Sequence, residues 1–268
     1  MKRKVILMGL LASIGLMANA QKGINIEAFV QPGLSFGGEY DVPSDNSTYS
    51  TYVALPKKST LGLIAGASFG YYFTNKVGAS VGLGYAHQGQ NYDKETYIDQ
   101  YGNAHSFTKS VSLNYLKVPF QFHFVTSSDK AISFALGAGF YFGYLLSYTD
   151  ETKTESSIGA ITTKASGSHI TTTVSGSNSP YFPNSSSSGT FSNGKPFWPI
   201  DFGLAIGAGL QFRVSDKISI PLMLNLQQGI TNVKNRICYY TDSKGSTNDY
   251  WDDQIQQAIT YRFLIAIL

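Results

Sequence analysis

The sequence predicts an all-β protein, an eight-stranded antiparallel up-and-down transmembrane β-barrel. In eight segments apolar residues alternate with small or polar ones, which is the period of an extended strand. Short polar turns alternate with long polar connections, an asymmetry typical of barrels that span a membrane. Only 14% of the residues are charged, against about 25% in ordinary soluble domains.

The N-terminal residues 1–20 have the features of a signal peptide. Three basic residues come first, residues 5–17 form an apolar centre, and Ala-Asn-Ala precedes a cleavage site near Ala20. The apolar centre is shorter than the roughly 20 residues of a spanning helix, which makes a membrane anchor the weaker interpretation. Without the leader, 17 basic residues balance 17 acidic ones. This neutral mature chain, residues 21–268, is predicted to be one barrel domain and gives no reason to expect nucleic acid as a partner.

The first strand is predicted at about 23–36, and a hairpin follows at 61–73 and 77–87 around the turn 74–76. Every second residue is apolar, and the residues between are mostly glycine, serine or polar, so each strand has one apolar face. These faces carry Ile24, Ile26, Ala28, Val30, Leu34 and Phe36, then Leu61, Leu63, Ala65, Ala67, Phe69, Tyr71 and Phe73, then Val77, Ala79, Val81, Leu83 and Tyr85.

The fourth and fifth strands are predicted at about 114–125 and 131–148, around the turn 126–130. Their alternation is strongly aromatic, as expected for a wall that contacts lipid. Their apolar faces carry Leu116, Val118, Phe120, Phe122 and Phe124, then Ile132, Phe134, Leu136, Ala138, Phe140, Phe142 and Tyr144.

The last three strands are predicted at about 200–214, 218–228 and 255–268, with a turn at 215–217. The same period of two defines them. Their apolar faces carry Phe202, Leu204, Ile206, Leu210 and Phe212, then Ile220, Leu222, Leu224 and Leu226, then Ile259, Tyr261, Phe263, Ile265 and Ile267.

Four long connections are predicted as external loops, at about 39–59, 91–110, 149–197 and 230–254. The three short turns are then expected in the periplasm. Serine and threonine dominate the longest connection, and such a composition buries little apolar surface. It is therefore predicted to be a mobile loop.

The charged residues of the predicted strands all lie on the face opposite the apolar one. A charge that faces lipid near the membrane centre costs about 2 to 4 kcal/mol, so this face is expected to line the interior. A soluble barrel would have the reverse pattern, with bulky apolar residues inside. The predicted interior polar set is Glu27, Gln31, Lys117, Gln121, His123, Asp201, Gln211, Arg213, Asn225, Gln227 and Arg262.

This interior set has two interpretations. It is either a binding or conduction path or an internal network of hydrogen bonds and ion pairs, and the narrow interior of an eight-stranded barrel favours the network. Glu27 and Arg262 are candidates to pair where the first and last strands meet.

Pro119 and Pro221 fall inside predicted strands, although proline has no N–H to donate. Each is expected either at a bulge or beyond the true end of its strand.

No catalytic, cofactor-binding or metal site is predicted. The four histidines lie on separate elements without the spacing of metal ligands, and the only cysteine is Cys238.

Three stretches resemble the PorT-like outer-membrane β-barrel family of Bacteroidetes, often labelled "porin family". They are NYLKVPFQFHF at 114–124, GAGFYFGYLLS at 137–147 and DFGLAIGAGLQF at 201–212. The resemblance implies a small barrel in the outer membrane of the cell envelope, with a role in secretion for some members.

The function predicted from the sequence is structural or recognition-based, exercised through the external loops. A small-solute channel is the first alternative, and a barrel enzyme acting on lipid or peptide, with Ser, His and acidic residues at the outer rim, is the second. The expected partners are outer-membrane lipid, the barrel-assembly machinery and an extracellular or envelope protein.

Overall fold

The computed structural model describes most of the chain. The described residues are 16–19, 23–36, 41–43, 52–54, 56–98, 104–127, 130–156, 159–176, 184–191, 196–215, 218–231, 239–242, 247–249 and 262–267. Within them, no helix is long and apolar enough to cross a membrane.

The described elements are all β-strands, which confirms the predicted fold class of an all-β antiparallel protein. They are β1 Leu16–Asn19, β2 Gly23–Phe36, β3 Asp41–Pro43, β4 Tyr52–Ala54, β5 Lys57–Lys58, β6 Thr60–Tyr72, β7 Val77–Ile98, β8 Ala104–Val125, β9 Ile132–Ser156, β10 Gly159–Ser166, β11 His169–Gly176, β12 Ser185–Phe191, β13 Ile200–Arg213, β14 Ile218–Gly229, β15 Tyr239–Asp242, β16 Thr247–Asp249 and β17 Arg262–Ile267.

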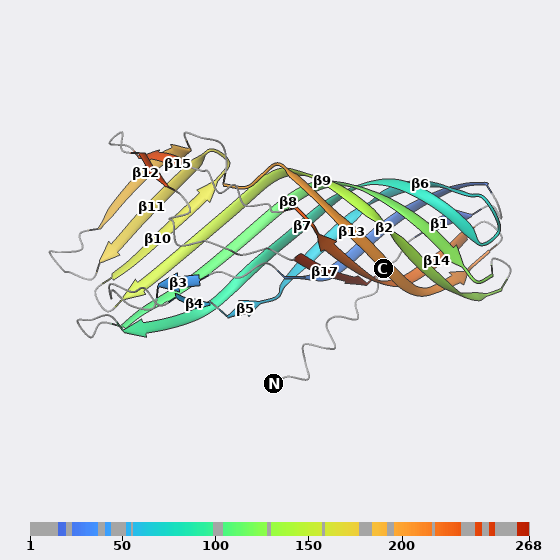
Figure 1. Ribbon diagram of the computed structural model, residues 1–268, viewed down its shortest axis with the longest axis horizontal. Coiled ribbons are helices and arrows are strands. Elements are labelled where there is room, and N and C mark those ends of the chain that lie inside the picture. The colour runs from blue at the N-terminus through green and yellow to red at the C-terminus, as the bar shows by residue number, and fades with distance from the viewer. Residues whose placement is uncertain are drawn as a thin grey trace.

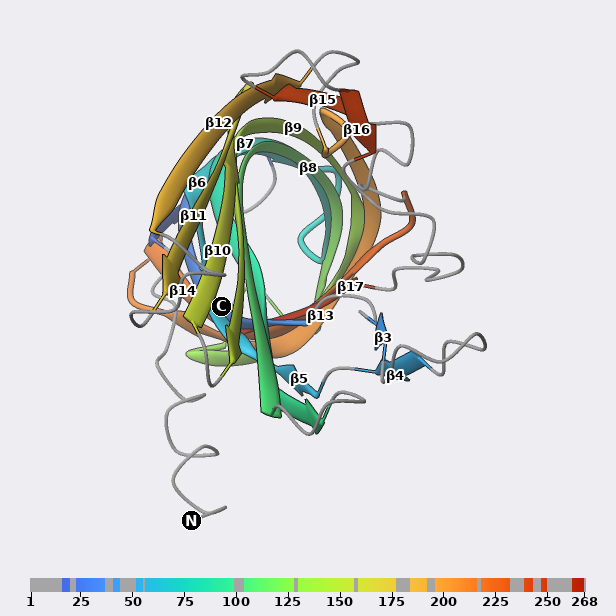
Figure 2. The same ribbon diagram turned by 90° about the vertical axis from the view of Figure 1, so that its left-hand side faces the viewer.

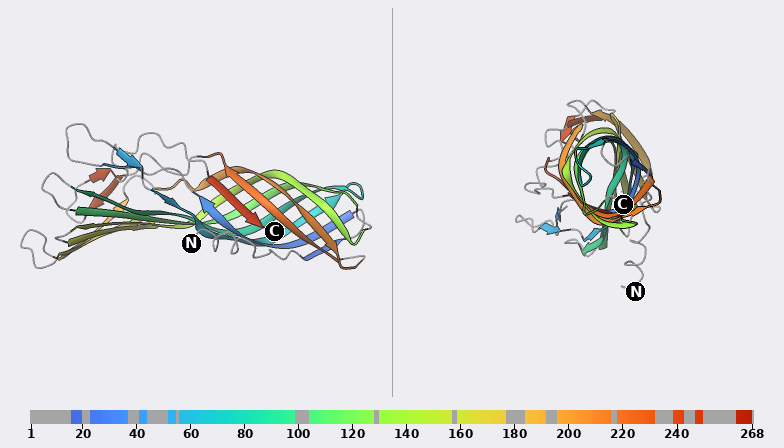
Figure 3. Two further views of the ribbon diagram at one scale, coloured as in Figure 1. Left: turned by 90° about the horizontal axis from the view of Figure 1, so that it is seen from below. Right: turned by 90° about the vertical axis from the view of Figure 1, so that its right-hand side faces the viewer.

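One continuous antiparallel wall runs from β2 to β17. Along it β2 pairs with β6, β6 with β7, β7 with β8 and β8 with β9. The wall continues from β9 to β13, from β13 to β14 and from β14 to β17. The other edge of β17 pairs with β2. Viewed along their length, these strands surround a common axis (Figure 2 and the right panel of Figure 3).

The alternation of faces is confirmed along this wall. In β6, Leu61, Leu63 and Phe69 are exposed, whereas Gly62, Ile64 and Gly70 are buried. The other strands repeat the pattern, so that bulky apolar residues cover the face turned away from the axis. We call the face turned toward the axis the inner face and the opposite one the outer face.

Three strands of the wall continue far beyond the rest. β7 and β8 have 22 residues each and β9 has 25, whereas a tilted strand crosses a bilayer in about 9–11. Beyond the wall, β10 pairs with β9, β11 with β10, and β12 with β11. We call this sheet, made of the distal parts of β7 to β9 and of β10 to β12, the extension. It projects from one end of the wall, opposite the short turns (Figure 1).

The three short turns are confirmed, and the strand ends next to them lie within one residue of the predicted limits. The far ends of β7, β8 and β9 extend well beyond the predicted limits. The turns join β6 to β7, β8 to β9 and β13 to β14. In the first, the N–H groups of Phe73 and Thr74 donate to the carbonyl oxygen of Val77, and the Thr74 hydroxyl accepts from the Val77 N–H.

Two of the predicted loops contain long strands, so the prediction that they lack regular structure is wrong. Most of 91–110 belongs to β7 and β8, and the segment 149–197 contains the end of β9 together with β10, β11 and β12. The physical reason is strand pairing. The distal part of β9 offers a free edge with which β10 pairs, and β11 and β12 then pair in turn. Serine and threonine are compatible with a strand when a neighbouring strand supplies its backbone hydrogen bonds. The connections 39–59 and 230–254 also contain short strands, β3 to β5 and β15 to β16.

Pro119 and Pro221 lie inside β8 and β14 at positions without a register shift, so neither predicted explanation holds. The shifts occur elsewhere, between Tyr92 and Glu95 in the β7–β8 pair and between Asn114 and Tyr115 in the β8–β9 pair. Beside Pro119, a Cβ at Gly82 would lie 3.1 Å from the proline Cγ, so glycine makes room for the ring.

Pro221 lies next to a break in the pairing. On that edge of β14, β1 pairs with Ile218 and Ser219, and β17 pairs from Leu224 onward. A missing donor is tolerated where the neighbouring ladder is interrupted.

The described residues include part of the predicted leader. β1 pairs with both β14 and β2, where β17 does not reach. Leu16–Asn19 of the full-length chain thus lie along the edges of β14 and β2. Cleavage of the leader stays a prediction.

Candidate functional site

Polar side chains from four strands meet on the inner face, in the half of the wall nearer the extension. The amine of Lys117, which is 2% exposed, donates to Oε1 of Gln227 at 3.1 Å. The Nε2 group of Gln227 donates to Oε1 of Gln31 at 3.4 Å. The Lys117 amine also lies 4.0 Å from the ring centroid of Tyr141, in the geometry of a cation–π contact. We call these residues, together with Asp201, the central cluster.

Asp201 is fully buried and accepts two hydroxyl donors. Tyr141 donates to its Oδ2 at 3.4 Å, and Thr231 donates to its Oδ1 at 3.0 Å. Both Lys117 and Asp201 stand opposite Gly143 in the sheet, one on each side. The two charged residues thus lie on either side of β9 at the same level of the wall.

A second group of polar contacts lies closer to the short turns. The hydroxyl of Ser68 donates to Oε2 of Glu27 at 3.3 Å, and Ser80 Oγ is 2.7 Å from Nε2 of His123. Near the end of β13, the amide of Gln211 donates to the hydroxyl of Ser219 at 2.7 Å. These are separate pairs, and they do not join the central cluster.

Apart from Arg262, the structure places the predicted interior set on the inner face, but these residues do not form one connected network. Gln31, Lys117, Asp201 and Gln227 contribute to the central cluster. Buried Asn225 packs against Gly207 instead. Six of the set are buried, namely Glu27, Gln31, Lys117, Asp201, Asn225 and Gln227. Four are half-buried, namely Gln121, His123, Gln211 and Arg213.

The side chain of Arg262 lies outside the described residues, but its backbone position excludes the suggested pair with Glu27. In the β17–β2 register, Phe263 is opposite Phe36, so Arg262 lies beyond that end of β2. Glu27 is nine residues away along β2, which is about 30 Å in a strand. The pairing fails because β17 meets only the far end of β2.

At three places on the inner face, a large aromatic side chain packs over a glycine of the neighbouring strand. A Cβ at Gly66 would lie 2.8 Å from the Phe29 ring, one at Gly78 would lie 3.0 Å from Tyr72, and one at Gly203 would lie 2.5 Å from Tyr141. Phe29, Tyr72 and Tyr141 are all buried. The sequence interpretation missed these aromatic residues, although their parity matches that of the inward glycines and would have identified them.

The outer face changes character where the extension begins. At this level the hydroxyl of Tyr85 and Nδ1 of His87 both lie 2.7 Å from Oδ1 of Asn114, and the Asn114 amide donates to Ser147 at 2.8 Å. Toward the short turns, the outer residues are apolar and exposed, such as Phe122 at 62%. The hydrogen-bonded residues therefore mark a boundary between an apolar and a polar outer surface.

Two rows of paired residues cross the outer face of the extension, and both are entirely polar. Their order follows the register of β8, β9, β10, β11 and β12. One row is Ser110, Glu151, Lys164, Thr171 and Ser188, and the other is Thr108, Lys153, Thr162, Thr173 and Ser186.

The base of the extension is fixed to the wall by a buried contact. The hydroxyl of Tyr148 donates to the carbonyl oxygen of Gly167 at 2.6 Å, and Phe197 packs on the Tyr148 ring with centroids 5.0 Å apart. Gly167 has φ of 62°, a left-handed conformation that glycine adopts without strain, at the β10–β11 turn. The extension is thus a packed sheet.

A buried ion pair also lies within the extension, at a position predicted to be loop. The Lys109 amine lies 2.9 Å from Oδ1 of Asp150, and the two side chains are 5% and 0% exposed. Apolar and polar residues continue to alternate on the N-terminal side of Asn114, and this pattern could have placed Lys109 on a strand.

Among the described residues, no group of three or more His, Cys, Asp or Glu is arranged to hold a metal ion. His87 and His123 are on opposite faces, and each contacts a neutral side chain. Cys238 lies outside the described residues.

Residues 17–235 match the family model of the outer membrane protein beta-barrel domain. No curated protein matches. Among solved structures, the chain is similar to Ail, the attachment invasion locus protein of Yersinia pestis, in complex with the heparin analogue sucrose octasulfate. The identity is 9%, the match covers 95% of this chain and 96% of that one, and the TM-score is 0.26, too low to support an argument. Because the family match spans most of the sequence, the chain belongs to the outer membrane protein beta-barrel domain family.

Proposed function

We propose that β2, β6, β7, β8, β9, β13, β14 and β17 form a closed eight-stranded, up-and-down barrel in the outer membrane. The pairing of β17 with both β14 and β2 supports closure. Backbone groups in hydrocarbon need partners, and a closed sheet provides them. We place the short turns in the periplasm and the extension outside the cell, as the usual asymmetry of such barrels favours.

Within this barrel, the interior serves stability and not conduction. The support is the packing of Phe29, Tyr72 and Tyr141 over inward glycines, together with the bonded central cluster. An eight-stranded barrel has an interior only about wide enough for side chains.

The function is recognition of an extracellular or envelope protein through the outer face of the extension. One observation carries this proposal: β7, β8 and β9 continue well past the apolar band and are joined by β10, β11 and β12 in a sheet with two polar rows. Strands of such length are not needed to cross the membrane. A rigid, hydrophilic sheet anchored at Tyr148 presents side chains at fixed positions, which reduces the entropy cost of binding.

The test is site-specific photo-crosslinking in intact cells. A photoreactive phenylalanine replaces Thr171 on the outer face of β11, and the matched control replaces Thr172, which faces the other way. The expected result is a discrete protein adduct for Thr171 and none for Thr172. Absence of any adduct at Thr171, combined with single-channel conductance in a planar bilayer, would favour the small-solute channel instead.

We also propose that the protein is not an enzyme. The arrangement nearest to a nucleophile and base is Ser80 with His123, and both are on the inner face. In the described part of the chain, no carboxylate is bonded to the other ring nitrogen of His123, as a catalytic triad would need.

Two further parts of the proposal rest on the sequence. The three resembling stretches support a place in the PorT-like branch found in Bacteroidetes, and the leader supports export with cleavage near Ala20 and delivery to the barrel-assembly machinery. N-terminal sequencing of the protein from purified outer membranes tests the cleavage, with Gln21 expected first.

A further inference from the structure

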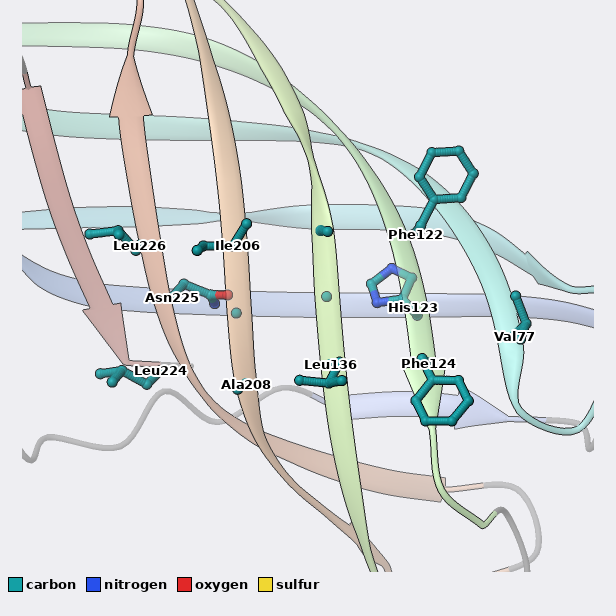
Figure 4. Close-up of a pocket in the computed structure, with 13 residues that line it drawn as sticks. Val77, Phe122, His123, Phe124, Leu136, Ile206, Ala208, Leu224, Asn225 and Leu226 are labelled. Atoms are coloured by element: carbon teal, nitrogen blue, oxygen red, sulfur yellow. The ribbon is translucent and has the colours of Figure 1, made fainter.

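A groove of about 820 Å³ lies on the wall close to the short turns (Figure 4). Thirteen residues line it, and they come from four neighbouring strands and the start of β7. They are Val77 and residues 122–124, 136–138, 206–208 and 224–226.

The floor of the groove is formed by two alanines. In one row across the wall, Ala138 lies between Phe122 and Ile206. In the next row, Ala208 lies between Leu136 and Leu224. The two alanines are on adjacent strands in adjacent rows, so they leave a diagonal depression among larger side chains.

The groove opens on the outer face and offers only apolar side chains there. Phe122, Ile206 and Leu224 are 62%, 57% and 55% exposed. The two polar residues of the lining are directed elsewhere: His123 contacts Ser80 inside, and Asn225 is 4% exposed.

The place and the size of the groove indicate what fills it. The protein belongs to an outer-membrane family, so its apolar outer face meets lipid chains or another protein. Stable protein interfaces use about 20–30 residues on each side, more than the 13 that line the groove. A groove lined by 13 residues is large enough for a single acyl chain.

Two lysines lie in the short turns at the end of the wall nearer the groove. Lys76 precedes Val77, and its carbonyl oxygen accepts the N–H of Val125, which fixes the turn beside the end of β8. Lys130 lies in the next short turn, and both lysines are exposed. Ammonium groups at this level suit a lipid phosphate.

We propose that the groove is a binding site for one acyl chain of a phospholipid, whose phosphate lies near Lys76 and Lys130. The choice of a phospholipid rests on the proposed orientation, because the short turns then lie at the periplasmic leaflet.

The test uses the full-length protein extracted from outer membranes in mild detergent and examined by native mass spectrometry. The variant A138F/A208F fills the groove with side chains already common on this face, and A67F adds one phenylalanine at an exposed alanine on β6, outside the groove. K76Q/K130Q removes the charges, and K58Q is its control at the other end of the wall. After delipidation, phosphatidylethanolamine or lipid A is added back separately.

Wild type, A67F and K58Q are expected to keep a phospholipid adduct, A138F/A208F to lose it, and K76Q/K130Q to release it at lower collision energy. Equal adducts in all variants would overturn the proposal. Preferential rebinding of lipid A would overturn the phospholipid assignment together with the orientation. A dimer mass that A138F/A208F abolishes would assign the groove to a second copy. None of these outcomes bears on recognition by the extension, which the crosslinking experiment tests separately.

Discussion

At the scale of single residues, glycine on the inner face decides which large side chains fit inside the wall. A Cβ at Gly139 would clash with the backbone carbonyl oxygen of Phe120, whereas one at Gly143 would lie 3.4 Å from Asp201 Cβ, an ordinary contact. Backbone cannot move aside as a flexible side chain does, so the two glycines differ in their tolerance of substitution.

Gly139→Ala is therefore expected to lower the free energy of unfolding by about 1 to 3 kcal/mol, the usual cost of overpacking. Gly143→Ala serves as the matched control on the same strand and is expected to be close to wild type. Urea unfolding of protein refolded in vesicles measures both. Equal losses for the two variants would contradict this account of the inner face.

The carboxylate of Asp201 is expected to stabilise the wall through the donors it satisfies. Asp201→Ala leaves the hydroxyls of Tyr141 and Thr231 without this acceptor, at a cost of about 1 to 3 kcal/mol. Asp201→Asn keeps one oxygen and is expected to lose less. If the same unfolding measurement gives no difference between the two variants, the hydrogen bonds to Asp201 do not stabilise the protein.

The sequence predicts the position of the polar residues on the inner face because parity in a strand assigns each side chain to one face. It does not predict which of them meet. Lys117 reaches Gln227 across the interior, and contacts between strands that are not neighbours depend on the curvature of the wall. Tyr141 was overlooked because an aromatic residue was expected on the lipid side, although its position in β9 places it inside.

At the scale of elements, strand prediction succeeds only where lipid makes the alternation necessary. The wall segments of β2, β6, β13 and β14 end near their predicted limits, because one face has to be apolar there. In β10 to β12 serine and threonine lie on both faces, so the period of two in hydrophobicity becomes weak although the strands continue. Residues 149–197 thus have the composition of a loop and the structure of a sheet.

The attachment of the extension depends on Tyr148. Tyr148→Phe removes the hydrogen bond to Gly167, worth about 1 kcal/mol. We expect faster amide hydrogen exchange in β10 and β11, with no change in the mobility of the unboiled protein on gels. Tyr144→Phe, at an exposed tyrosine of the outer face, is the control. Unchanged exchange in Tyr148→Phe would show that the contact does not hold the hairpin.

At the scale of the whole molecule, the apolar band and the polar extension define how the protein sits in the membrane. The band ends where Tyr85, His87 and Asn114 form their hydrogen bonds, and the short turns close its other end (Figure 3, left). The sequence predicted the apolar outer face of the wall, but it assigned the polar residues of the extension to loops.

The most direct test of this arrangement is cysteine labelling with a membrane-impermeant maleimide, in a Cys238→Ser background. Three single cysteines are compared, at Thr171 on the extension, at Phe122 in the apolar band and at Asn75 in a short turn, all at exposed positions. We predict that Thr171→Cys reacts in intact cells, that Asn75→Cys reacts only after the outer membrane is permeabilised, and that Phe122→Cys reacts in neither case. Labelling of Phe122→Cys in intact cells would contradict the account, because water and not lipid would then cover the apolar face.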